Sequence, residues 1–96
     1  MEPSPASWAM IHKAEQALDE GKLDLAQTMF ERAQRMSQKS PHVDYRFARL
    51  RMKQENWHQA KQLCYKALSL TGNNSAYRNK ILERIANINE SQGDVK

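Results

Sequence analysis

The sequence predicts an all-α fold of five helices, arranged as two helix-turn-helix repeats followed by a C-terminal capping helix. Gly and Pro are scarce, with three of each in 96 residues, whereas good helix formers such as Ala, Leu, Gln and Lys are common. Turn-forming residues divide the chain into segments of helical length. Two of these segments repeat at one constant offset along the chain.

The first two helices are bounded by a cap and a glycine. Ser4 before Pro5, or alternatively Ser7, can cap the first helix, because a serine hydroxyl accepts from a free N–H of the first turn. Gly21 ends it, since glycine readily adopts the left-handed conformation that closes many helices. The two helices are expected at about residues 7–20 and 23–37.

The other three helices are separated by two further turns. Ser40 before Pro41 combines a serine cap with proline at the first helical position. A Glu55-Asn56 turn follows the third helix, and the loop "TGNNS" at residues 71–75 follows the fourth. The three helices are expected at about residues 41–54, 57–70 and 75–91.

A repeat with an offset of 34 residues becomes visible when residues 21–36 are aligned with residues 55–70. The same offset places the fifth helix where the first helix of a third repeat would lie, as a cap on the second repeat. Ile81, Leu82, Ile85 and Ile88 are expected to pack there. The matched pairs are Leu23 with Trp57, Ala26 with Ala60, Met29 with Leu63, Phe30 with Cys64, Ala33 with Ala67 and Met36 with Leu70.

A helix-turn-helix unit of this length, about 34 residues, resembles the tetratricopeptide repeat (TPR). The family's second-helix pattern is met by Ala26, Phe30 and Ala33, and again by Ala60, Cys64 and Ala67, while Phe47-Ala48 matches its paired leucine and glycine. The resemblance implies a TPR-like superhelix. The expected divisions are a flexible N-terminus (1–6), a single TPR-like domain (7–91) made of repeats 7–40 and 41–74 with a capping helix 75–91, and a flexible C-terminus (92–96).

Residues that could carry chemistry are few, and no enzyme activity is predicted. None of the three histidines has a partner at the i+4 spacing of helical metal sites. Cys64 and His58 are six residues apart on one helix, so their side chains point about 120° apart. The repeat assigns Cys64 to a packing position, as a small hydrophobe. No catalytic residue, metal or cofactor is expected.

The net positive charge of the chain lies in the third helix and the residues just before it. Residues 39–53 contain five basic residues and one acidic residue, which accounts for the net charge of +4. Tyr45, Arg49, Met52 and Lys53 form one stripe of this helix, flanked by His42 and Arg46. In the TPR family the first helix of each unit lines a concave groove, so the resemblance implies that the stripe faces a bound partner. The candidate partner-binding residues are Trp8, His42, Tyr45, Arg46, Arg49, Met52, Lys53, Asn79 and Lys80.

These residues suggest a non-catalytic adaptor that binds an acidic or extended segment of another protein. The family's arrangement for binding a C-terminal carboxylate is not reproduced, because Ile11, Glu15 and Ala76 occupy three of its positions, although Arg46 and Lys80 match others. A solvated basic face is the alternative for the third helix alone. Nucleic-acid binding is a less favoured function, because acidic residues face the bases. Weak self-assembly through the fifth helix or Trp8 is another.

The sequence says little about location. No apolar run is long enough to span a bilayer, and no basic region followed by an apolar stretch begins the chain. Compact chains of this kind are similar to small bacterial envelope proteins, often lipid-anchored, and this resemblance suggests the periplasm. The residues themselves permit the cytoplasm equally.

Overall fold

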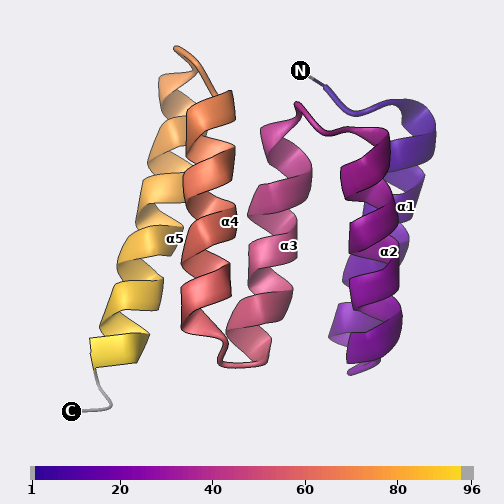
Figure 1. Cartoon of the computed structure of the whole chain (residues 1–96), viewed down its shortest axis with the longest axis horizontal. Helices are drawn as coiled ribbons and strands as arrows, with labels where there is room; N and C mark the ends of the chain where they lie inside the picture. Colours follow the sequence, from indigo (N-terminus) through magenta and orange to yellow (C-terminus); the bar gives the residue numbers. More distant parts are fainter. Residues whose placement is uncertain (1, 94–96) are drawn as a thin grey trace.

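Five α-helices follow one another in the computed structural model, which describes residues 2–93 (Figure 1). Helices account for all the regular secondary structure of this described part. The predicted all-α architecture of two helix pairs and a fifth helix is confirmed. The helices are α1 (Pro5–Asp19), α2 (Leu23–Met36), α3 (Pro41–Lys53), α4 (Trp57–Leu70) and α5 (Ser75–Gly93).

The first helix begins at Pro5 rather than at about residue 7. Ser4 is its cap, because the Ser4 hydroxyl accepts a hydrogen bond of 3.1 Å from the Ser7 backbone N–H. Residues 5 and 6, which the sequence assigns to the N-terminal tail, therefore belong to α1. The last helix extends to Gly93, and residues 94–96 of the expected C-terminal tail lie outside the described residues.

The two repeats close their first helices with the same turn. Gly21 after α1 has φ +79°, and Glu55, its equivalent in the second repeat, has φ 56°. In both turns the next N–H bonds back to the last helical turn, from Lys22 to the Ala17 carbonyl and from Asn56 to the Arg51 carbonyl, each at 2.8 Å. The second repeat therefore holds a glutamate in a left-handed conformation that favours glycine.

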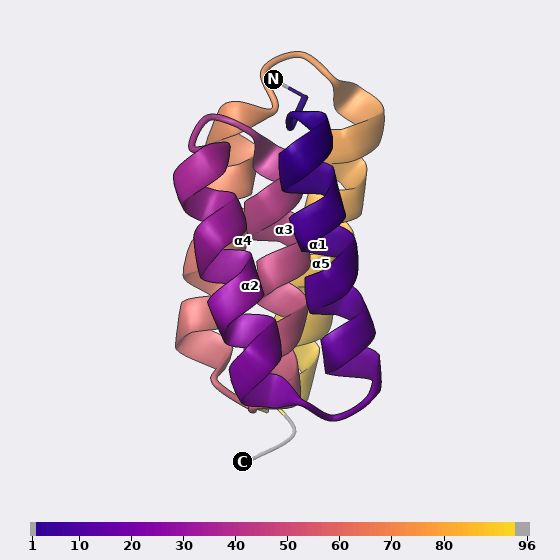
Figure 2. The same cartoon turned by 90° about the vertical axis from the view of Figure 1, so that its right-hand side faces the viewer.

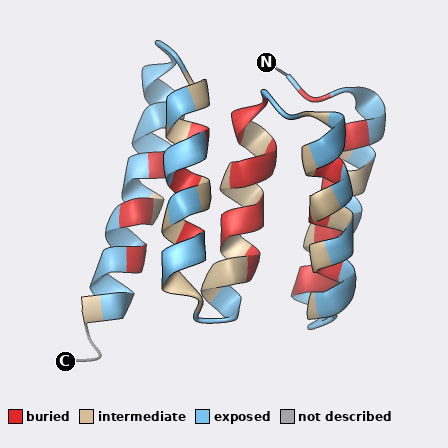
Figure 3. Cartoon of the chain, viewed as in Figure 1, coloured by how far each residue is buried: buried red, intermediate tan, exposed pale blue. Residues whose placement is uncertain are grey.

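Helices α1 and α5 lie on one side of the molecule and α2 and α4 on the other, with α3 between the two sides (Figure 2). In Figure 2, α1 and α5 lie to the right, α2 and α4 to the left, and α3 between them. Figure 3 shows that buried residues follow the faces along which neighbouring helices meet. None of the described helices combines the length and apolar character needed to cross a membrane.

Helix α3 contributes to each of the three clusters of buried residues that form the core. On one side of α3, the stacked rings of Phe30 and Phe47, with centroids 5.1 Å apart, pack among side chains of α1 and α2. On the other side, α3 and α4 meet α5 around Cys64, which is 0% exposed. The packing role predicted for Cys64 is confirmed, and burial raises the pKa of its thiol to about 11.

The fifth helix packs on the second repeat through one stripe of isoleucines. Ile81, Ile85 and Ile88 are buried there as expected. Leu82 is 43% exposed, so the prediction that it joins this contact is wrong. The reason is geometric: consecutive residues of a helix are turned about 100° from each other, and Leu82 points away from α4 when Ile81 points toward it.

Candidate protein-binding face

A row of aromatic rings joins α1, α3 and α5 on the side of the molecule where these helices lie. The Trp8 and His42 rings have centroids 5.3 Å apart, and His42 and Tyr77 follow at 4.6 Å. Tyr45 meets Tyr77 edge-on at 5.4 Å, and His12 lies 5.8 Å from Trp8. We call this surface, with the charged residues described next, the α1–α3–α5 face.

Two arginines lie over these rings. The guanidinium carbon of Arg46 is 5.2 Å from the Trp8 ring centroid, and that of Arg84 is 4.0 Å from the Tyr45 ring centroid. Arg84 also donates a hydrogen bond of 2.6 Å to the Tyr45 backbone carbonyl, which ties α5 to α3. These contacts hold the cations against aromatic surface, where the ring electrons attract them.

Acidic side chains of α1 neutralise two bases of α3. Arg46 Nη1 donates to Glu15 Oε1 at 2.9 Å, and Arg49 Nη2 donates to Asp19 Oδ1 at 2.5 Å. The Arg46 and Glu15 side chains are 33% and 23% exposed, so this pair is better shielded from water than the pair of Arg49, at 37%, with Asp19, at 61%. The predicted basic stripe is therefore partly matched within the chain.

His42 contacts an acid from the start of the chain. Its Nε2 lies 3.2 Å from the Glu2 carboxylate, and their side chains are 20% and 75% exposed. Burial lowers the pKa of His42, and the Glu2 carboxylate opposes that shift. His42 is therefore mostly neutral at pH 7 and presents its ring as aromatic surface with one donor.

Two buried polar atoms of this face have no hydrogen-bond partner among the described residues. They are Arg46 Nε and the Tyr77 hydroxyl. Burial also raises the pKa of Tyr77 above its usual value, so the hydroxyl keeps its proton and remains a donor. Both groups can donate a hydrogen bond to water or to a partner's carbonyl or carboxylate.

Most predicted site residues meet on this face, but not all. Arg49 follows the centre of the face along α3, whereas Met52 packs beside the core shared by α3, α4 and α5. The centre itself is formed by Trp8, His42, Tyr45 and Arg46. Three further predicted residues are exposed and make no hydrogen bond or ion pair with another described residue: Lys53, Asn79 and Lys80.

Two residues of this face, Tyr77 and Arg84, were not predicted from the sequence. By the repeat offset they correspond to Val43 and Leu50, which are buried, so the pattern predicts core positions for both. Their long polar side chains instead reach α3, with Tyr77 against His42 and Arg84 against Tyr45. The signal was a tyrosine and an arginine in positions that hold aliphatic residues in the preceding repeat.

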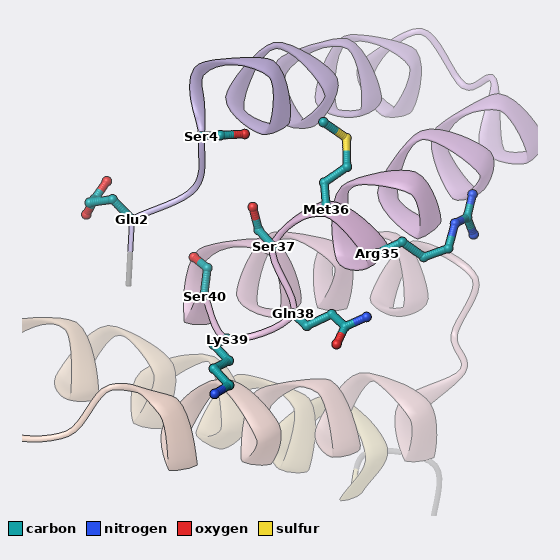
Figure 4. Close-up of a pocket in the computed structure, with 8 residues that line it drawn as sticks. All are labelled: Glu2, Ser4, Arg35, Met36, Ser37, Gln38, Lys39 and Ser40. Carbon is teal, nitrogen blue, oxygen red and sulfur yellow. The ribbon is translucent and has the colours of Figure 1, made fainter.

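Other hollows of the surface do not assemble a site. One of about 390 Å³ lies between the N-terminal segment and the turn from α2 to α3 (Figure 4). Its charged residues Glu2, Arg35 and Lys39 lie apart from one another in Figure 4, and the Ser4 and Ser40 hydroxyls already cap helices. Within residues 2–93 no three or more potential metal-binding side chains gather.

Comparison with known proteins agrees with this architecture. A profile of the tetratricopeptide repeat matches residues 17–86. The chain belongs to the tetratricopeptide-repeat family. Among solved structures, this TPR chain is similar to the globular C-terminal domain of P. aeruginosa LpoP, with 34% sequence identity and a TM-score of 0.88 over 96% of this chain and 87% of that chain. A search of curated proteins found no match.

Membership of the family has a direct consequence for activity. TPR units are typically non-catalytic modules for binding other proteins. The predicted resemblance to the TPR family is confirmed, and the similar solved domain comes from a bacterium. The chain is thus a TPR domain of the protein-interaction type, and its α1–α3–α5 face is the candidate binding surface.

Proposed function

We propose that this TPR domain is an adaptor that binds a segment of another protein along the α1–α3–α5 face. The observation that carries the proposal is the row of rings and cations at the centre of the face. Trp8, His42, Tyr45 and Tyr77 lie ring to ring, with Arg46 and Arg84 against them. Aromatic residues and arginine dominate the residues that contribute most to protein interfaces.

An acidic partner segment is supported by two features. Glu2, an acidic side chain from outside the helices, already contacts His42 at 3.2 Å. Lys53 and Lys80 are exposed bases without an ion pair to another described residue. A partner carboxylate near Arg46 or Arg49 has to compete with Glu15 or Asp19, so the attraction is weaker than the number of bases suggests.

The test is affinity capture from the source cell with matched charge variants. The groove variant is Arg46→Gln/Arg49→Gln, which removes both charges without placing new acids beside Glu15 and Asp19. The control is Arg32→Gln/Arg35→Gln, the same charge change at two exposed positions of α2. Circular dichroism first establishes that both variants are folded.

A partner of the proposed kind is captured by the original chain and by the control but lost with the groove variant. Its affinity is then measured with purified protein by calorimetry. We expect at least a 10-fold loss for the groove variant, because Arg46 lies against the Trp8 ring at the centre of the face, and truncating a central arginine of an interface costs about 2 kcal/mol or more. If every captured protein binds all three forms equally, the assignment of the α1–α3–α5 face is wrong.

Nucleic-acid binding receives no comparable support. Arg46 and Arg49 are matched by acids of α1, and Arg51 contacts Gln27 on α2 at 3.1 Å, away from the other bases. The continuous basic surface that binds phosphates independently of sequence is therefore not formed by these residues. A flat anisotropy titration with random oligonucleotides at low salt is the expected result.

A further inference from the structure

One side of the fifth helix is exposed, whereas the equivalent sides of α1 and α3 are buried within the repeats. Ala14 of α1 is covered by α2, and Ala48 of α3 is covered by α4; both are 0% exposed. Their equivalent on α5, one repeat after Ala48, is Leu82, which is 43% exposed. Among residues 2–93, no helix covers this side of α5.

The uncovered side of α5 is a single ridge of residues at four-residue spacing. It consists of Arg78, Leu82, Ala86 and Glu90, all of them exposed. Residues four apart differ by about 40° around a helix, so this ridge is inclined to the α5 axis, and helices that cross at an angle pack through such ridges. Arg78 and Glu90 make no ion pair with another described residue.

This ridge is complementary to the same ridge of a second copy in antiparallel orientation. An antiparallel copy centred beside Arg84 brings Leu82 against Ala86 of the second copy, and Ala86 against its Leu82. The same alignment brings Arg78 opposite Glu90 of the second copy at both ends. We propose that α5 packs antiparallel on α5 of a second copy of this chain, in a two-fold symmetric contact. The proposal is independent of the protein bound at the α1–α3–α5 face.

The expected dimer is weak. Two leucines and two alanines form its apolar centre, and a single helix pair buries less than the roughly 1,200 Å² of stable interfaces. We therefore expect a dissociation constant on the order of 0.1–1 mM. Because the contact is symmetric, reversing one charge creates two like-charge pairs and should weaken the dimer by about 5- to 30-fold.

The experiment is sedimentation equilibrium of the purified chain at concentrations up to about 1 mM, comparable with the expected dissociation constant. The variants are Arg78→Glu, Glu90→Arg, and both together. All change exposed side chains, so the fold should tolerate them. Each single variant should be more monomeric than the original, and the double variant should recover the dimer, because the charge pair is restored in reverse.

A second pair of variants separates the ridge from general stickiness. Leu82→Asp should abolish dimerisation, whereas Leu25→Asp, at a leucine of α2 that is 44% exposed, should leave it unchanged. The proposal is overturned if the original chain is monomeric at about 1 mM, or if the double charge variant fails to recover the dimer. Equal effects of Leu82→Asp and Leu25→Asp would overturn it as well.

Discussion

Replacing Glu55 with glycine should stabilise the protein. Glu55 has φ 56° in the turn after α3, the left-handed region, where the equivalent turn after α1 holds Gly21 with φ +79°. The Glu55 side chain is exposed, and it makes no hydrogen bond or ion pair with another described residue. The substitution therefore removes backbone strain at Glu55 with little loss of contacts.

The size of the effect follows from two opposing terms. A non-glycine residue in the left-handed conformation costs about 1–2 kcal/mol. The new glycine opposes this gain by about 0.5–1 kcal/mol, because the unfolded chain then has more backbone conformational entropy to lose on folding. The net gain for Glu55→Gly is about 0.5–1 kcal/mol, which corresponds to a rise in melting temperature of about 2–8 °C for a domain of this size.

Thermal unfolding followed by circular dichroism measures this change, and Gly21→Glu is the matched reverse. A Cβ added at Gly21 meets nothing within 4 Å, so that variant reports the backbone cost alone and should lose about the amount that Glu55→Gly gains. If Glu55→Gly lowers the melting temperature while Gly21→Glu also lowers it, Glu55 has a favourable contact that the strain argument omits.

Three further predictions concern buried polar groups. The Cys64 thiol, with its pKa raised to about 11 from 9.0, should carry about 100-fold less thiolate at pH 8 than a free thiol and react at least that much more slowly with Ellman's reagent until urea unfolds the chain. Asp44 accepts a 2.9 Å bond from Gln34, but burial raises its carboxyl pKa. Ionisation of Asp44 as pH rises therefore lowers the free energy of unfolding. In urea titrations, Asp44→Asn should be at least as stable as the original at pH 7, and it should lose that advantage in acid, where Asp44 is protonated. Tyr77→Phe should change the free energy of unfolding by less than about 0.5 kcal/mol, because the hydroxyl bonds no described residue; a loss above about 1 kcal/mol would reveal a bound water or other partner.

The repeat architecture could be predicted because small residues recur where the paired helices cross. Ala14 and Ala48, one repeat apart, allow these helices to approach closely, and both are fully buried. Leu82 shares their register but not their burial. Periodicity shows which face of a helix is apolar, but burial of that face also needs a covering helix, and residues 2–93 contain none after α5.

The candidate site was predictable where it depends on one helix. The four-residue spacing on α3 places Tyr45 and Arg49 on one face, and both lie there with partners from neighbouring helices. Contacts between helices were harder, because they depend on side-chain length and not on register alone. Tyr77 and Arg84 reach α3 from positions that aliphatic residues bury in the preceding repeat.

The contacts on the α1–α3–α5 face bear on what kind of partner it suits. Arg46 is held between Glu15 and the Trp8 ring, and Arg84 between the Tyr45 carbonyl and its ring, so neither arginine loses much freedom on binding. Because Arg46 already forms an ion pair with Glu15, a purely acidic segment gains little binding energy at the centre of the face. Exposed Lys53 offers a charge on α3 away from that centre. We therefore expect the face to prefer a segment that places an apolar or aromatic side chain against the rings and its acids beside such free lysines.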